Sequence, residues 1–113
     1  MATYEEVKDV PNHPETYLFD VRNETELKET GVLPASLNIP LAELEKALNL
    51  PAKDFAQTYG REKPAIDATL IFSCKAGGRA ARAANLASTL GFTNAKAYAG
   101  SWTEWEAKQS KNL

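Results

Sequence analysis

The chain has 113 residues, 43% of them hydrophobic and 25% charged, which is enough to build the core of one domain spanning 1–113. A single cysteine and a single histidine exclude an internal disulfide and a metal cluster made of these two ligand types. The net charge of -2 and the lack of a long apolar run give no reason to expect nucleic acid or a membrane as a partner. We therefore expect a cytoplasmic monomer that holds no metal or cofactor.

The first part of the chain predicts two helices on either side of a strand. A capping-box pattern at 3–6 begins a short helix, which the following prolines end. Residues 17–19 form an apolar run and predict a buried strand that ends at Asp20. A second capping-box pattern, at 23–26, begins a helix that stops near Gly31.

The middle of the chain continues this alternation. A short strand is expected over 37–39, where a proline closes it. Leucines at helical spacing predict a helix over 41–49, and a proline start with a glycine stop predicts another over 51–60. After a polar connection, the apolar run at 69–73 is the strongest strand signal of the chain, and Cys74 follows it directly.

The last part of the chain predicts a helix, a strand and a helix. Small and apolar residues share one face of a helix that follows the glycine pair and stops at Gly91. A last short strand covers 96–98, and a third capping-box pattern at 101–104 begins a helix whose two tryptophans, 102 and 105, would meet the core. Strands that alternate with helices predict an α/β fold with a mostly parallel central sheet.

The expected site lies at one edge of this sheet. In open parallel sheets, ligands bind where the strands end. Cys74 follows the strongest strand and Asp20 ends the first one, so both residues should lie at the same edge. The lone His13 stands beside a proline in an expected loop, and we read it as an exposed residue without a role in the chemistry.

The loop from Cys74 to Arg79 joins the strand to a helix start and has three features that activate a thiol. The positive end of the helix dipole favours the thiolate. Gly77 and Gly78 allow backbone N–H groups to turn inward and form a nest for an anion. Lys75 and Arg79 add positive charge that would lower the thiol pKa further. We therefore expect a reactive thiolate inside an anion-binding pocket.

Two reactions fit such a loop. Cysteine phosphatases have five residues between the cysteine and the arginine, whereas four separate Cys74 from Arg79. The smaller cup favours one extra sulfur atom over a phosphate group, and a phosphatase would also need a general acid, which the sequence does not supply. An arsenate reductase with an internal resolving thiol is disfavoured by the single cysteine. A non-catalytic binding or regulatory domain remains an alternative that the intact loop disfavours.

The chain resembles the rhodanese (thiosulfate sulfurtransferase) homology family over nearly its whole length. The stretches that carry the resemblance are 18–22, 31–40, 74–79 and 99–105. The insert over 41–63 is most similar to that of small single-domain eukaryotic members. The resemblance implies a rhodanese-like fold in which helices flank both faces of the sheet. Ala80 departs from the family, in which a serine or threonine often stands here, so one hydroxyl contact near the sulfur is expected to be absent.

The resemblance also implies a mechanism. The Cys74 thiolate attacks the outer sulfur of a donor such as thiosulfate, and the persulfide that forms is held by the backbone of Lys75, Ala76, Gly77, Gly78 and Arg79. A thiophilic acceptor (glutathione, thioredoxin or cyanide) then takes the sulfur.

Four further side chains are expected to support the site. Lys75 and Arg79 would attract the sulfonate of the donor. Asp20 and Arg22 have family positions that allow them to support the loop, and we read them as a structural ion pair or a strand-end cap.

Overall fold

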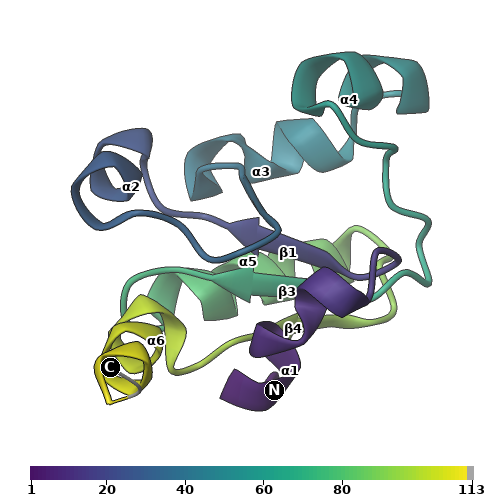
Figure 1. The fold of residues 1–113 in the computed structure, drawn as a ribbon. Coiled ribbons are helices and arrows are strands. Elements are labelled where there is room, and N and C mark those ends of the chain that lie inside the picture. Colours follow the sequence, from purple (N-terminus) through teal and green to yellow (C-terminus); the bar gives the residue numbers. More distant parts are fainter. Residues whose placement is uncertain (112–113) are drawn as a thin grey trace.

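Four short strands form a parallel sheet at the centre of the molecule (Figure 1). The computed structural model describes residues 1–111. The strand order is β2-β1-β3-β4, and every pairing between these strands is parallel. The strands are β1 (Tyr17–Asp20), β2 (Ser36–Asn38), β3 (Leu70–Ser73) and β4 (Ala95–Ala97). The predicted α/β fold with a mostly parallel sheet is confirmed.

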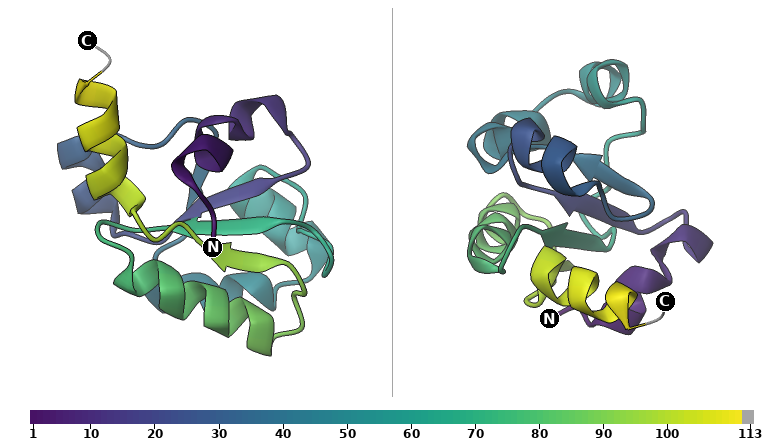
Figure 2. Two further views of the ribbon diagram at one scale, coloured as in Figure 1. Left: turned by 90° about the horizontal axis from the view of Figure 1, so that it is seen from below. Right: turned by 60° about the vertical axis from the view of Figure 1, so that its left-hand side comes forward.

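Helices cover both faces of the sheet, as the family resemblance implied. One face carries α1 (Tyr4–Lys8), the 3-10 helix η1 (Val10–Asn12) and α6 (Ser101–Ser110). The other face carries α3 (Leu41–Leu48), α4 (Ala52–Tyr59) and α5 (Gly78–Thr89). The left view of Figure 2 shows α1 and α6 on one side of the strands and α5 on the other. The remaining helix, α2 (Glu24–Thr30), has no buried residue.

The strands supply residues to two separate cores. Alternate side chains of a strand point to opposite faces, so Phe19 and Phe72 pack with α3 and α5, whereas Leu18 and Ile71 pack with α1 and α6. Because both faces are covered, β1 and β3 are buried along their whole length. This explains why their sequences read as continuous apolar runs.

Two of the three predicted capping boxes begin a helix as expected. The Oγ1 atom of Thr3 accepts a hydrogen bond of 3.1 Å from the Glu6 backbone N–H and caps α1. The Glu26 carboxylate accepts one of 2.9 Å from the Asn23 N–H at the start of α2.

None of the helices in residues 1–111 has the length and apolar character that a membrane span requires.

The third capping box is wrong. Ser101 is not the cap but the first residue of α6, and the carbonyl of Gly100 accepts the Glu104 N–H at 3.0 Å. The Ser101 side chain is fully buried, and its hydroxyl donates to the carbonyl of Tyr98 at 2.7 Å. A buried carbonyl without a hydrogen bond costs more free energy than a helix end that water can reach, so the serine side chain points inward to the Tyr98 carbonyl.

Candidate active site

Because the four strands are parallel, their carboxyl ends lie at the same edge of the sheet, and the expected site lies there. Backbone hydrogen bonds continue past the ends of the strands, from Val21 N to Ser73 O at 2.8 Å and from Ile39 N to Asp20 O at 3.0 Å. The Asn38 amide side chain donates to the carbonyls of both Asp20 and Arg22, each at 2.9 Å. These bonds fix the turn after β1 next to the loop that follows β3, so Asp20 and Cys74 share this edge as predicted.

The Cys74 sulfur lies inside the loop and is surrounded by hydrogen-bond donors. Its side chain is buried, with 2% of the residue exposed. The sulfur accepts hydrogen bonds from the Gly77 N–H at 3.0 Å and from the Ala80 N–H at 3.4 Å. Both donors belong to the start of α5, whose first N–H groups have no partner within the helix. The predicted nest of backbone N–H groups is therefore present.

This environment favours the thiolate. Burial alone would raise the pKa of Cys74, but hydrogen bonds from the N–H groups of Ala80 and Gly77, the Ser101 hydroxyl and the Ala76 N–H lower it by more. The pKa therefore lies below its ordinary value of 9.0. A thiolate that is shielded from water and accepts hydrogen bonds from fixed donors is suited to nucleophilic attack.

Only one glycine of the loop is required by geometry. Gly77 has a φ of +106°, and a Cβ atom at this position would lie 2.5 Å from the carbonyl oxygen of Ala99. Gly78 is the first residue of α5, and a Cβ atom there would meet nothing within 4 Å. The two glycines were expected to act together in shaping the loop, whereas the turn depends on Gly77.

A hydroxyl from α6 reaches the sulfur, which the sequence did not suggest. The Oγ atom of Ser101 accepts the Cys74 N–H at 3.0 Å and lies 3.8 Å from the Cys74 sulfur. The hydroxyl contact that was expected to be absent because of Ala80 is thus supplied from elsewhere in the chain. The position of Ser101 directly after Gly100 in the closing family segment was the available signal, but the same residues also match a capping box.

The start of α6 also holds the outside of the loop. The Trp102 N–H donates to the carbonyl of Cys74 at 3.0 Å. Thr103 donates twice to the carbonyl of Lys75, from its N–H at 3.0 Å and from its hydroxyl at 2.9 Å. These bonds use the carbonyl groups of the loop, so the loop N–H groups remain available to the sulfur.

The two cations of the loop differ in their surroundings. The Arg79 guanidinium forms a two-pronged ion pair with Glu26 of α2, with distances of 2.7 and 2.9 Å. The guanidinium was expected to add positive charge beside the sulfur, and Glu26 was not among the predicted site residues. The Arg79 hydrogen bonds lower the pKa of Glu26 to about 2, although partial burial opposes this. Lys75 is exposed and forms no ion pair with the other residues that the structure describes.

Asp20 and Arg22 form the structural ion pair that was expected. Each residue is only 1% exposed. The Arg22 Nη2 and Nε atoms lie 2.7 and 3.0 Å from the Asp20 carboxylate oxygens, and Nη1 donates to Thr30 Oγ1 at 2.8 Å. The guanidinium also lies 5.0 Å from the centre of the Trp102 ring. The pair therefore joins the end of β1 to α2 and α6.

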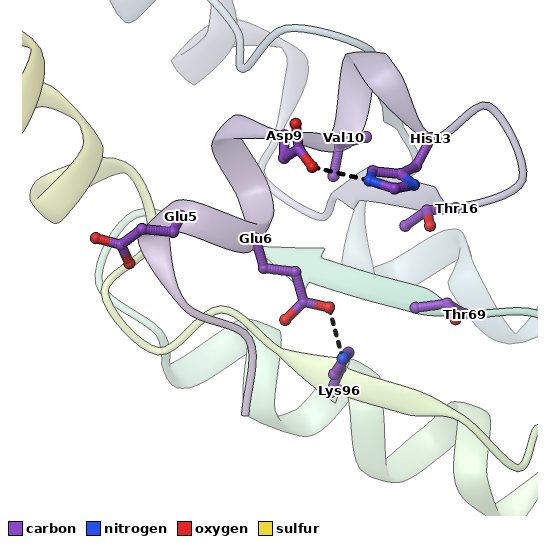
Figure 3. Close-up of a pocket in the computed structure, with 8 residues that line it drawn as sticks. All are labelled: Glu5, Glu6, Asp9, Val10, His13, Thr16, Thr69 and Lys96. Atoms are coloured by element: carbon purple, nitrogen blue, oxygen red, sulfur yellow. Dashed lines mark hydrogen bonds and ion pairs between the residues drawn. The ribbon is translucent and has the colours of Figure 1, made fainter.

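His13 lies far from this chemistry, beside a cavity of about 380 Å³ (Figure 3). Thr16 and Thr69 line the same cavity and stand just before β1 and β3, which places it at the opposite edge of the sheet from Cys74. The His13 ring contacts Asp9 at 2.8 Å and Glu15 at 3.1 Å. The expectation of an exposed histidine without a catalytic role agrees with this position.

Comparison with known proteins agrees with this geometry. Residues 3–108 match the Rhodanese-like domain family. The Rhodanese domain-containing protein CG4456 of Drosophila melanogaster is 53% identical over 109 residues, covering 96% of this chain and 98% of that protein. The human Thiosulfate:glutathione sulfurtransferase is 45% identical over 94 residues, covering 82% of this chain and 81% of that protein.

A solved structure gives the same result for the fold. The human single-domain sulfurtransferase TSTD1 superposes with a TM-score of 0.87 at 38% identity, and the match covers 96% of each chain. A parallel sheet flanked by helices and a buried cysteine in a nest at the start of a helix thus occur together with similarity over nearly the whole sequence. The chain belongs to the rhodanese-like domain family.

Proposed function

We propose that the protein is a sulfurtransferase that moves sulfane sulfur from thiosulfate to glutathione through a persulfide on Cys74. The observation that carries this proposal is the position of the Cys74 sulfur, which is buried and faces the N–H groups of Gly77 and Ala80. Such a nest holds a sulfur anion without any charged side chain. The printed name of the human thiosulfate:glutathione relative supports the choice of donor and acceptor.

The reaction proceeds in two exchanges. The Cys74 thiolate attacks the outer sulfur of thiosulfate, a new S–S bond forms, and sulfite leaves with the electron pair of the broken S–S bond. The persulfide anion remains on Cys74, facing the loop donors. The thiolate of the acceptor then attacks the outer sulfur, and the Cys74 thiolate leaves, which restores the starting state. Thioredoxin and cyanide are alternative acceptors for the same second step.

The phosphatase alternative gains no support from the site. That reaction needs a general acid for the leaving group. Asp20 is the carboxyl group that the sequence places at this edge, and it is buried in the ion pair with Arg22. Both of its carboxylate oxygens accept hydrogen bonds from the Arg22 guanidinium, so this side chain is committed to the ion pair and not to a leaving group in the loop.

Intact-mass measurement after incubation with thiosulfate tests the proposal. The wild type should gain one sulfur atom and release an equal amount of sulfite, and the Cys74→Ser variant should do neither. Glutathione should then remove the added sulfur as glutathione persulfide. A wild type that gains no sulfur from thiosulfate, mercaptopyruvate or glutathione persulfide would overturn the assignment to sulfur transfer. Loading from one of the other two donors alone would overturn the choice of thiosulfate.

We also propose that the protein acts as a cytoplasmic monomer. A chain with a single cysteine forms no internal disulfide and suits a reducing compartment. Cell fractionation and the mass measured by light scattering check the two parts separately.

A further inference from the structure

The positive charge of Arg79 is neutralised by a partner that is itself fixed. The Glu26 Oε2 atom accepts the Asn23 N–H at 2.9 Å and lies 2.7 Å from Arg79 Nη1, so the carboxylate is held from its own helix. The two side chains are 28% and 27% exposed, which shields the pair partly from water. The guanidinium is therefore held towards α2 by a carboxylate that is itself fixed by a hydrogen bond within α2 and its cap.

The remaining charges at this edge are one buried ion pair and one exposed cation. Asp20 and Arg22 form a buried pair without net charge. Lys75 is the cation of the loop without an ion-pair partner among residues 1–111, and its side chain is exposed to solvent and salt. An incoming anionic donor thus meets backbone N–H groups and one solvent-screened cation, Lys75, rather than two free cations.

We propose that Glu26 determines donor specificity by holding Arg79 and so reducing the preference of the site for doubly charged donors over singly charged ones. This inference rests on the proposed function, because it concerns the donor of the same sulfur. The Glu26 carboxylate bonds to Arg79 and to the Asn23 N–H and acts on the donor through Arg79, so it is a positioning residue.

Two sulfur donors of similar size but different charge distinguish an effect of charge from an effect of shape. Thiosulfate carries two negative charges, whereas methanethiosulfonate has a methyl group in place of one sulfonate oxygen and carries one. Each loses its outer sulfur to the Cys74 thiolate, and sulfite or methanesulfinate leaves with the electron pair. A guanidinium released from Glu26 would attract the doubly charged donor more strongly.

The experiment measures kcat/KM for both donors and compares their ratio, thiosulfate over methanethiosulfonate, among variants. Glu26→Gln keeps an oxygen to accept the Asn23 N–H but removes the charge that holds Arg79. The ratio should rise about threefold, a size typical of one partly exposed charge contact, mainly through a lower KM for thiosulfate. The double variant with Arg79→Gln should show the same ratio as Arg79→Gln alone.

The matched control is Glu24→Gln, which removes one negative charge from the same helix turn. Glu24 is exposed and lies 3.5 Å from Lys28, whereas Arg79 pairs with Glu26. Its ratio should stay at the wild-type value. An equal rise in Glu24→Gln, or an equal loss for both donors in Glu26→Gln, would overturn the inference in favour of a general charge effect or a structural role. If the wild type accepts sulfur from neither donor, the proposed function is wrong, and this assignment falls with it.

Discussion

At the scale of single residues, the reactivity of Cys74 depends on groups that donate hydrogen bonds to its sulfur. Burial raises the pKa of this thiol, so the donors must outweigh a real cost to keep it low. The backbone supplies most of these donors, and no substitution other than proline removes them. Ser101 is the exception, because its contribution comes from a hydroxyl, whose single hydrogen is shared between the Tyr98 carbonyl at 2.7 Å and the sulfur at 3.8 Å.

We predict that Ser101→Gly raises the pKa of Cys74. Ser101 has a φ of +50°, which glycine adopts without strain, so the variant removes the hydroxyl and keeps the backbone. The rate of alkylation by iodoacetamide against pH measures the thiolate, and its midpoint should move to higher pH. Cys74 is the only cysteine of the chain, so the signal is unambiguous. An unchanged midpoint in a folded variant would show that the hydroxyl serves only the Tyr98 carbonyl.

The two loop glycines should differ sharply when each is changed to alanine. Gly77→Ala places a Cβ atom against the Ala99 carbonyl in a backbone conformation that alanine avoids, and we expect a loss of about 2 kcal/mol or more in unfolding free energy. Gly78→Ala adds a methyl group in open space at a helix start and should be neutral or stabilising by up to about 1 kcal/mol. Urea unfolding measures both, and equal effects would contradict the assigned roles.

At the scale of elements, the Asp20–Arg22 pair joins β1 to the helices on either side of the loop. Asp20→Ala leaves a guanidinium buried without its carboxylate, which costs roughly 3–5 kcal/mol. Replacing both residues at once, with alanine and methionine, should cost less than the single change, since no charge is then left buried. Chemical denaturation of the two variants provides the comparison. A double variant that is less stable than Asp20→Ala would show that packing of the arginine stem matters more than its charge.

The same elements show what sequence can predict here. Caps and spacing involve neighbouring residues, so the starts of α1 and α2 were predicted correctly from Thr3 and Asn23. The partners within the site are distant in sequence. Glu26 and Arg79 are 53 positions apart, and Ser101 is 27 from Cys74. Only the folded sheet brings them together, which is why Glu26 was not predicted and why Ser101 was given the wrong role.

At the scale of the whole molecule, the site forms where three separate parts of the chain meet. The loop after β3 is held by α2 through the Arg79 ion pair and by α6 through the hydrogen bonds to the Lys75 carbonyl. Figure 1 shows these two helices above and below the strand ends at the left of the molecule. The attachment to α2 involves ionised groups, so it depends on pH.

Stability in acid should therefore depend on Glu26. Its pKa is about 2 in the folded protein, against an ordinary value of 4.5, and the Arg79 contact is the largest cause, so the ionised pair stabilises the fold above pH 4.5. This contribution, about 1 kcal/mol for a pair that solvent partly screens, is lost as the pH falls from 4.5 towards 2. Urea unfolding of wild type and Glu26→Gln should give free energies that differ at neutral pH and converge in this window, while Glu24→Gln follows the wild type. A gap that persists at pH 2 would mean that Glu26 stabilises the fold through its shape and not its charge.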